Sequence, residues 1–146
     1  MSKQTALEIE QYIYNTIKTY IEENINGKLY HQNCRPLNSM EEDAIIGMLN
    51  VDANQIQNGR ARIYIYCKDI NNGVGRAVPN IERLTTLSKL GEPIVELLNE
   101  GSTDYLWELH EAPSMERTMT TGVAGNNKPI DQHQINIILD FERVTF

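Results

Sequence analysis

Several features that are common in enzymes, secreted proteins and membrane proteins are scarce or missing in this sequence. Its two cysteines, Cys34 and Cys67, form no CxxC pair, so neither a zinc finger nor a disulfide framework is expected. No run of about eighteen apolar residues occurs, which predicts no membrane-spanning helix. Residues 1–10 contain no apolar core of a signal peptide. Together these absences predict a protein that is made and used inside a cell.

Basic residues are also outnumbered, and they are scattered along the chain. The 146 residues include 20 acidic and 13 basic side chains, a formal net charge of −7. Affinity for nucleic-acid phosphates comes from clustered lysine and arginine, so this balance argues against a protein that wraps nucleic acid. The length is typical of one domain, and 40% hydrophobic residues can form its core. We expect a single domain over residues 1–146 with no metal or cofactor.

Two segments have the hydrophobic spacing of helices. Residues 5–25 place isoleucines three or four positions apart, and the Asn-Gly dipeptide that follows is a typical helix end. A second helix is expected over residues 79–98, beginning at a proline that suits a first turn. Pro93 lies inside this second pattern and should kink the helix or split it in two.

Four segments are predicted strands. Residues 28–34 are a short candidate, and residues 104–111 alternate in polarity. The strongest patterns are residues 55–70 and 135–142, where apolar side chains recur at every second position. The apolar positions predict one buried sheet face, made of Ala61, Ile63, Ile65, Cys67, Trp107, Leu109, Ile135, Ile137, Leu139 and Phe141.

Two segments are harder to assign. Residues 39–49 contain a capping-box spacing and could form a helix, whereas residues 44–51 could be a strand. Residues 112–132 have neither the hydrophobic period of a helix nor that of a strand, and they are expected to form one long loop. Such a loop in a compact domain usually has a function. The expected order is α-β-β-β-α-β-β if residues 44–51 are a strand. This order predicts an α+β domain with two helices packed on one face of a mostly antiparallel sheet.

No set of residues has the spacing of a catalytic or metal site. His31, His110 and His133 lie on different predicted strands, and no pattern predicts that they converge. His31 and Cys34 could supply two metal ligands, but a structural zinc site needs four. The acidic run at residues 41–43 is interpreted as a solvated cap. We therefore expect that this protein is not an enzyme. In the enzymatic alternative, the three histidines and nearby carboxylates would come together to form an active site.

The outward positions of the strand over residues 55–70 are the strongest candidate for a functional surface. Arginine and tyrosine alternate there, and such residues could stack nucleic-acid bases. Tyrosine and arginine are also enriched in protein–protein interfaces, and the net charge of −7 favours that interpretation. This stripe consists of Arg60, Arg62, Tyr64 and Tyr66, followed by Lys68.

The expected loop over residues 112–132 adds apolar interface candidates. It is polar and contains glycine, yet it carries Met115, Met119 and Val123. A solvated linker has little use for such residues, whereas a segment that orders against a neighbour does. We expect this loop to pack on another subunit.

Four local strings occur in the same chain: residues 26–30 (NGKLY), residues 35–39 (RPLNS), Glu42-Asp43 and residues 62–66 (RIYIY). With the order of elements, they resemble small tail-terminator or tail-completion proteins of tailed phages and prophages of gut Bacteroidales. The resemblance covers the chain from about residue 5 to its end. It implies a small α+β domain in which residues 44–51 are a strand.

The resemblance also implies a function. The chain would be a structural virion protein without catalysis, part of a ring at the head–tail junction (the neck), assembled in the bacterial cytoplasm. Its partners would be copies of itself in a six- or twelve-fold ring and the neighbouring connector and tail proteins. DNA would only pass through the lumen, and no membrane is involved. The alternative is a small nucleic-acid-binding or regulatory protein of a mobile element that uses the arginine–tyrosine stripe.

Overall fold

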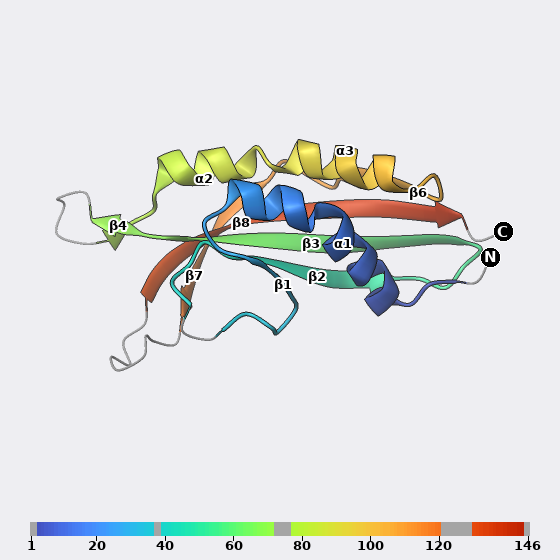
Figure 1. Cartoon of the computed structure of the whole chain (residues 1–146), viewed down its shortest axis with the longest axis horizontal. Helices are drawn as coiled ribbons and strands as arrows, with labels where there is room; N and C mark the ends of the chain where they lie inside the picture. Colours follow the sequence, from blue (N-terminus) through green and yellow to red (C-terminus); the bar gives the residue numbers. More distant parts are fainter. Residues whose placement is uncertain (1–2, 37–38, 72–76, 121–129, 145–146) are drawn as a thin grey trace.

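A mostly antiparallel sheet with helices along one face makes up the fold (Figure 1). The computed structural model describes residues 3–36, 39–71, 77–120 and 130–144. The predicted α+β class and the main order of elements are confirmed. The strands are β1 (Leu29–His31), β2 (Ala44–Val51), β3 (Ile56–Lys68), β4 (Ile70–Asn71), β5 (Ala77–Val78), β6 (Tyr105–Leu109), β7 (Ser114–Thr120) and β8 (Ile130–Val144).

Helix α1 (Ala6–Asn24) begins at a capping box. The Thr5 hydroxyl accepts from the Glu8 N–H at 3.2 Å, and the Thr5 N–H donates to the Glu8 carboxylate at 3.1 Å, so two free backbone donors are satisfied. The isoleucine spacing places one stripe fully inside the core: Ile9, Ile13, Ile17 and Ile21. Within the part of the chain that the structure describes, no helix is long and apolar enough to cross a membrane.

The expected second helix is split into α2 (Ile81–Ser88) and α3 (Gly91–Gly101). Pro93 lies in the first turn of α3, where its missing N–H removes no helical hydrogen bond, so the break falls just before it. Gly91 allows α3 to begin close to the chain that follows β6. A Cβ on Gly91 would lie only 3.2 Å from the Pro113 ring.

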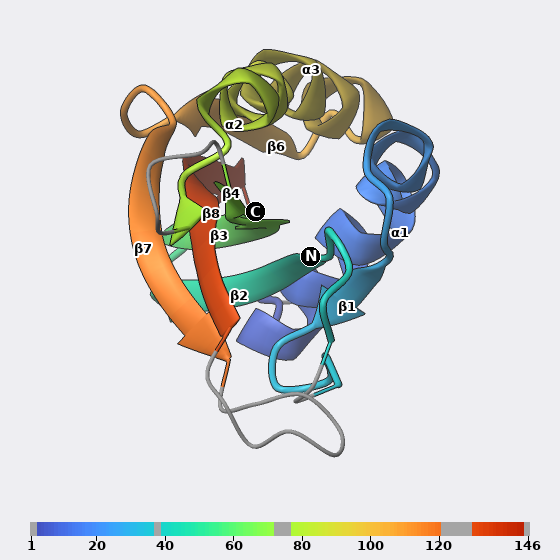
Figure 2. The same ribbon diagram turned by 90° about the vertical axis from the view of Figure 1, so that its left-hand side faces the viewer.

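The order of the sheet is β1-β2-β3-β8-β6, and β8 pairs with three other strands. It pairs along one side with β3, and along the other with β7 and then β6. β1 runs parallel to β2, and the other pairs in this sheet are antiparallel. Figure 2 shows the sheet curving so that α1, α2 and α3 close its open side. The core lies between the helices and the concave face of the sheet.

The predicted buried face is confirmed. Ile63 pairs with Ile137 at the middle of the sheet, and both are fully buried. The strands place their odd-numbered residues on this face because side chains alternate along a strand. Leu109 is only partly buried, and the other members are buried: Ala61, Ile63, Ile65, Cys67, Trp107, Ile135, Ile137, Leu139 and Phe141.

The prediction of one long loop over residues 112–132 is wrong in two parts. β7 occupies Ser114–Thr120, and β8 begins at Ile130 rather than near residue 135. β7 lacks a clear alternation because it is an edge strand, with its first four residues exposed. Val123 and its neighbours at 121–129 lie outside the described residues. The ambiguous residues 44–51 form strand β2, which pairs with β3.

The expectation that the acidic run at residues 41–43 is a solvated cap agrees with the exposure of Glu41 but is wrong for the two residues that follow it. Glu42 is 8% exposed and Asp43 is 1% exposed. Arg83 of α2 donates from Nε to Glu42 at 2.8 Å, and Arg35 donates from Nε to Asp43 at 2.9 Å. Buried carboxylates require such partners, and Arg83 comes from a distant part of the chain. The run therefore ties the β1–β2 connection to α2.

Candidate interface on the outer face of the sheet

All three helices pack on the face formed by the odd-numbered residues of β3 and β8 (Figure 2). We call the opposite face, formed by their even-numbered residues, the outer face. On β3 its side chains are half-buried at positions 60, 62, 64 and 66 and exposed at the two ends of the strand. The arginine–tyrosine stripe of β3 lies on this face, as the alternation predicts.

The centre of the outer face carries a stacked cation and aromatic ring. The Arg62 guanidinium carbon lies 3.8 Å from the centre of the Tyr64 ring. Ile45 of β2 pairs with Tyr64, and Ile138 of β8 pairs with Arg62. Among the described residues, Arg62 forms no ion pair, so none of them neutralises its charge directly. We call these four residues the Arg62–Tyr64 patch.

The two ends of the stripe contact other side chains of the same protein. Arg60 donates from Nε to Asp140 of β8 at 2.8 Å. Tyr66 lies under Arg35, whose guanidinium carbon is 4.0 Å from the ring centre, and burial raises the pKa of Tyr66. Arg60 and Tyr66 are thus engaged within the chain, whereas the middle of the stripe is free to contact a partner. The role of Arg35 was not predicted, because no local pattern connects it with a residue thirty-one positions away.

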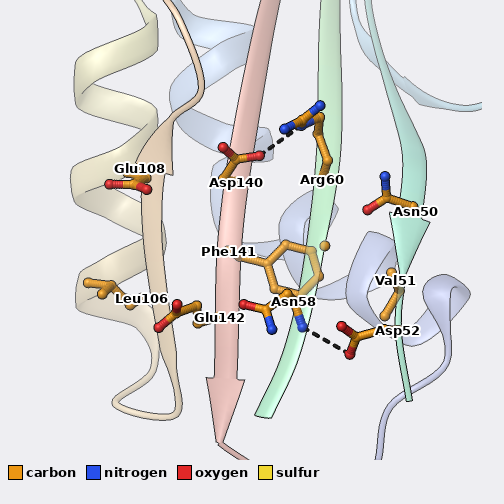
Figure 3. Close-up of a pocket in the computed structure, with 11 residues that line it drawn as sticks. Asn50, Val51, Asp52, Asn58, Arg60, Leu106, Glu108, Asp140, Phe141 and Glu142 are labelled. Carbon is orange, nitrogen blue, oxygen red and sulfur yellow. Dashed lines mark hydrogen bonds and ion pairs between the residues drawn. The ribbon is translucent and has the colours of Figure 1, made fainter. Parts of the chain in front are cut away.

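Beyond Arg60, the outer face opens into a hollow of about 560 Å³ (Figure 3). We call it the acidic hollow. Burial would raise the pKa of Asp140, but hydrogen bonds from Arg60 and His110 outweigh it and hold that pKa below its ordinary value. Asp140 therefore stays ionised. The charged residues that line the hollow are Asp52, Arg60, Glu108, Asp140 and Glu142.

The acidic hollow was not predicted, although the sequence contains a pattern that points to it. Asp140 and Glu142 occupy outward positions of one alternating strand, and Glu108 occupies an outward position of another. Nothing local indicates that these two strands are neighbours. Their pairing brings Glu108 directly opposite Asp140 and Leu106 directly opposite Glu142.

The three histidines each bind a different carboxylate. His31 Nδ1 lies 2.8 Å from Glu10, and its ring stacks on Tyr14. His110 lies 2.8 Å from Asp140, and His133 lies 2.7 Å from Asp69. In the described ranges, no three histidine, cysteine or acidic side chains are grouped so that they could hold a metal ion. The structure does not bring the three histidines together.

The remaining candidate residues, two cysteines and two methionines, form no common site among the described residues. Cys34 is exposed, whereas Cys67 is buried and burial raises the pKa of its thiol to about 11. Such a thiol stays protonated at neutral pH and is a weak nucleophile. Met115 of β7 is exposed, and Met119 belongs to the same strand.

Comparison of the chain with protein families and with curated proteins finds no match. The tail-terminator resemblance therefore stays a prediction. The outer face, with its Arg62–Tyr64 patch and its acidic hollow, is the most distinctive surface of the described residues.

Proposed function

We propose that this protein is a structural virion component, a subunit of a ring at the head–tail junction that assembles through the outer face of its sheet. The observation that carries the proposal is the Arg62–Tyr64 patch on a sheet face that none of the three helices covers. The resemblance to phage tail-terminator proteins supplies the virion location and the neighbouring connector and tail proteins as partners.

The patch has the properties of a protein interface. Arginine and tyrosine are the side chains that most often dominate binding energy at such surfaces. The stack on Tyr64 already restricts Arg62, so less conformational entropy is lost when a partner binds. Ile45 and Ile138 add half-buried apolar area beside the stack. A partner that covers the patch would remove this area from water.

A ring requires a heterologous contact, in which two different surfaces of neighbouring subunits meet. The outer face supplies one such surface. We propose β7 as the second, because it is an edge strand and Met115 on it is 45% exposed. Edge strands offer unpaired backbone groups as well as side chains to a neighbour.

The nucleic-acid alternative has less support from the outer face. Arg60 is already bound to Asp140, and Glu108 and Glu142 lie close by. Carboxylates at this position would repel a phosphate backbone. A gel-shift titration with single-stranded DNA at several salt concentrations tests this alternative, since phosphate contacts weaken as salt rises.

The assembly test uses the double variant Arg62→Ala/Tyr64→Ala. Its matched control is Lys18→Ala/Tyr14→Ala, which removes the cation–aromatic pair of α1 on the helix side, where Lys18 lies 5.0 Å from the Tyr14 ring centre. Circular dichroism melts first establish that both variants fold. Mass photometry over a concentration series, and incorporation into particles assembled with the neighbouring proteins, then compare them with the parent.

We expect the control to assemble as the parent does and the Arg62–Tyr64 variant to remain monomeric and outside particles. Assembly of both variants at the parent's level would contradict the interface. The virion location has its own test, which is mass spectrometry of purified particles of the encoding phage. Absence of the protein from intact particles would contradict that part of the proposal.

A further inference from the structure

Carboxylates from three parts of the chain meet at one end of the outer face. Glu108 of β6 lies directly across from Asp140 of β8, and Glu142 follows on the same face of β8 (Figure 3). Asp52, just after β2, lies on the opposite side of the acidic hollow. Arg60 is the one cationic side chain among the described lining residues. The hollow has the volume of a site for a large side chain or a short peptide segment.

Most of this negative charge has no cationic partner among the described residues. Asp140 is bound by Arg60 and His110, but within the described residues neither the Glu108 nor the Glu142 side chain forms a hydrogen bond or an ion pair. Glu108 lies directly opposite Asp140, whose charge Arg60 and His110 already offset, so the charge left without a partner is that of Glu108 and Glu142. A bound cation would balance this charge.

Exposed apolar side chains lie on the same end of the outer face. Leu106 lines the hollow and is 61% exposed. Ile56 and Val144 form a cross-strand pair on this face, and they are 44% and 39% exposed. A free polyamine would make little use of them, whereas a protein segment would cover them and remove apolar area from water. The surface therefore combines anionic and apolar recognition.

A second copy of this chain is a poor occupant. Its Arg35, Arg60 and Arg83 are already bound to carboxylates of the same chain. Its Arg62 forms no ion pair among the described residues, but it is half-buried on the sheet and stacked on Tyr64, so it does not project as a side chain that could enter the hollow. The net charge of −7 also disfavours placing the acidic hollow against another copy. A segment of a different protein can bring a projecting cation without this net negative charge.

We propose that the acidic hollow docks a segment of a different protein that carries a lysine or arginine flanked by apolar side chains. The cation enters between Glu108 and Glu142, and the flanking apolar side chains cover Leu106 and the Ile56–Val144 pair. This surface is separate from the Arg62–Tyr64 patch, and the inference does not depend on ring assembly.

The test is a nuclear magnetic resonance titration of the isotope-labelled protein at about 50 mM salt, where surface charges are weakly screened. The probes are the tripeptide acetyl-Leu-Arg-Leu-amide, its glutamine counterpart acetyl-Leu-Gln-Leu-amide, and spermidine as a free cation. We expect the arginine peptide to shift the backbone amides of Leu106, Glu108 and Glu142, and to bind more tightly than either other probe.

The variant Glu108→Gln/Glu142→Gln removes both unpaired charges without changing side-chain size. Its control, Glu92→Gln/Glu100→Gln, makes the same change in net charge on exposed positions of α3. We expect the first variant to bind the arginine peptide about five- to tenfold more weakly and the control to bind it as the parent does. The first variant should also melt no lower than the parent, because neither glutamate side chain has a hydrogen bond or ion pair among the described residues to lose.

Three results would overturn the proposal. Equal weakening in both variants would indicate only general attraction to an acidic protein. Tighter binding of spermidine than of the peptide would indicate a site for a free cation. A change of oligomeric state in Glu108→Gln/Glu142→Gln would indicate that a second copy occupies the hollow. Arg62→Ala/Tyr64→Ala should retain peptide binding, so failure of ring assembly and failure of this inference are distinguishable.

Discussion

Truncating Ile137 tests the packing at the centre of the sheet. Ile137 is fully buried on β8, lies opposite Ile63, and approaches the start of α3. Its Cγ2 is 3.7 Å from the position that a Cβ on Gly91 would take. Ile137→Ala removes three carbons from beneath a helix and a strand that are held by other contacts, so the cavity cannot close fully. We expect a loss in the upper part of the usual range, about 3–5 kcal/mol.

For a chain of this length, such a loss lowers the melting temperature by about 6–20 °C. The matched control is Ile138→Ala, one residue further along β8, where the side chain is half-buried on the outer face opposite Arg62. We expect it to cost about 1–2 kcal/mol, because less apolar area is lost. Urea and thermal unfolding followed by circular dichroism give both values. A larger loss for Ile138→Ala than for Ile137→Ala would refute the register, since a slip of one residue exchanges the two faces.

Three further predictions follow from single side chains. In native protein at about pH 8, a thiol reagent should modify Cys34 and spare Cys67 until denaturant is added, because Cys67 is buried with a pKa of about 11; rapid reaction of both thiols would contradict the packing. The pKa of Asp140 is lowered in the folded protein, so its ionised form stabilises the fold above about pH 3.9, and that contribution is lost as the pH falls through the folded-state pKa. The melting temperature of the parent should therefore fall more steeply than that of Asp140→Asn between about pH 5 and pH 2, and parallel curves would contradict the assignment. Gly59→Ala should cost about 1–3 kcal/mol, since its Cβ would lie 2.6 Å from the Phe141 ring, and an unchanged melt would show that this pairing is wrong.

Much of the fold follows from local patterns. The alternation in β3 and β8 predicts which residues are buried, because side-chain direction along a strand depends only on position within it. The same reasoning places Arg62 and Tyr64 together on the outer face. The isoleucine spacing of α1 predicts its buried stripe for the equivalent reason in a helix.

Other features depend on partners that are distant in sequence. β7 is a strand because β8 pairs with it, and its own exposed residues carry no alternation. Glu42 is buried because Arg83, forty-one residues away, neutralises it. A run of acidic residues therefore looks like a solvated cap until its cations are placed.

The features of the candidate site likewise fall into two groups, those that follow from local patterns and those that depend on distant partners. The sequence by itself determined that the stripe of β3 and the carboxylates of β6 and β8 point away from the core, since each lies at an outward position of an alternating strand. The tertiary structure alone decided that Asp140 neutralises Arg60, that Arg35 covers Tyr66, and that Glu108 meets Asp140 at the rim of a hollow. Alternation sets the face on which a side chain lies, whereas strand order and register set its neighbours, and these depend on pairing between segments far apart in the chain.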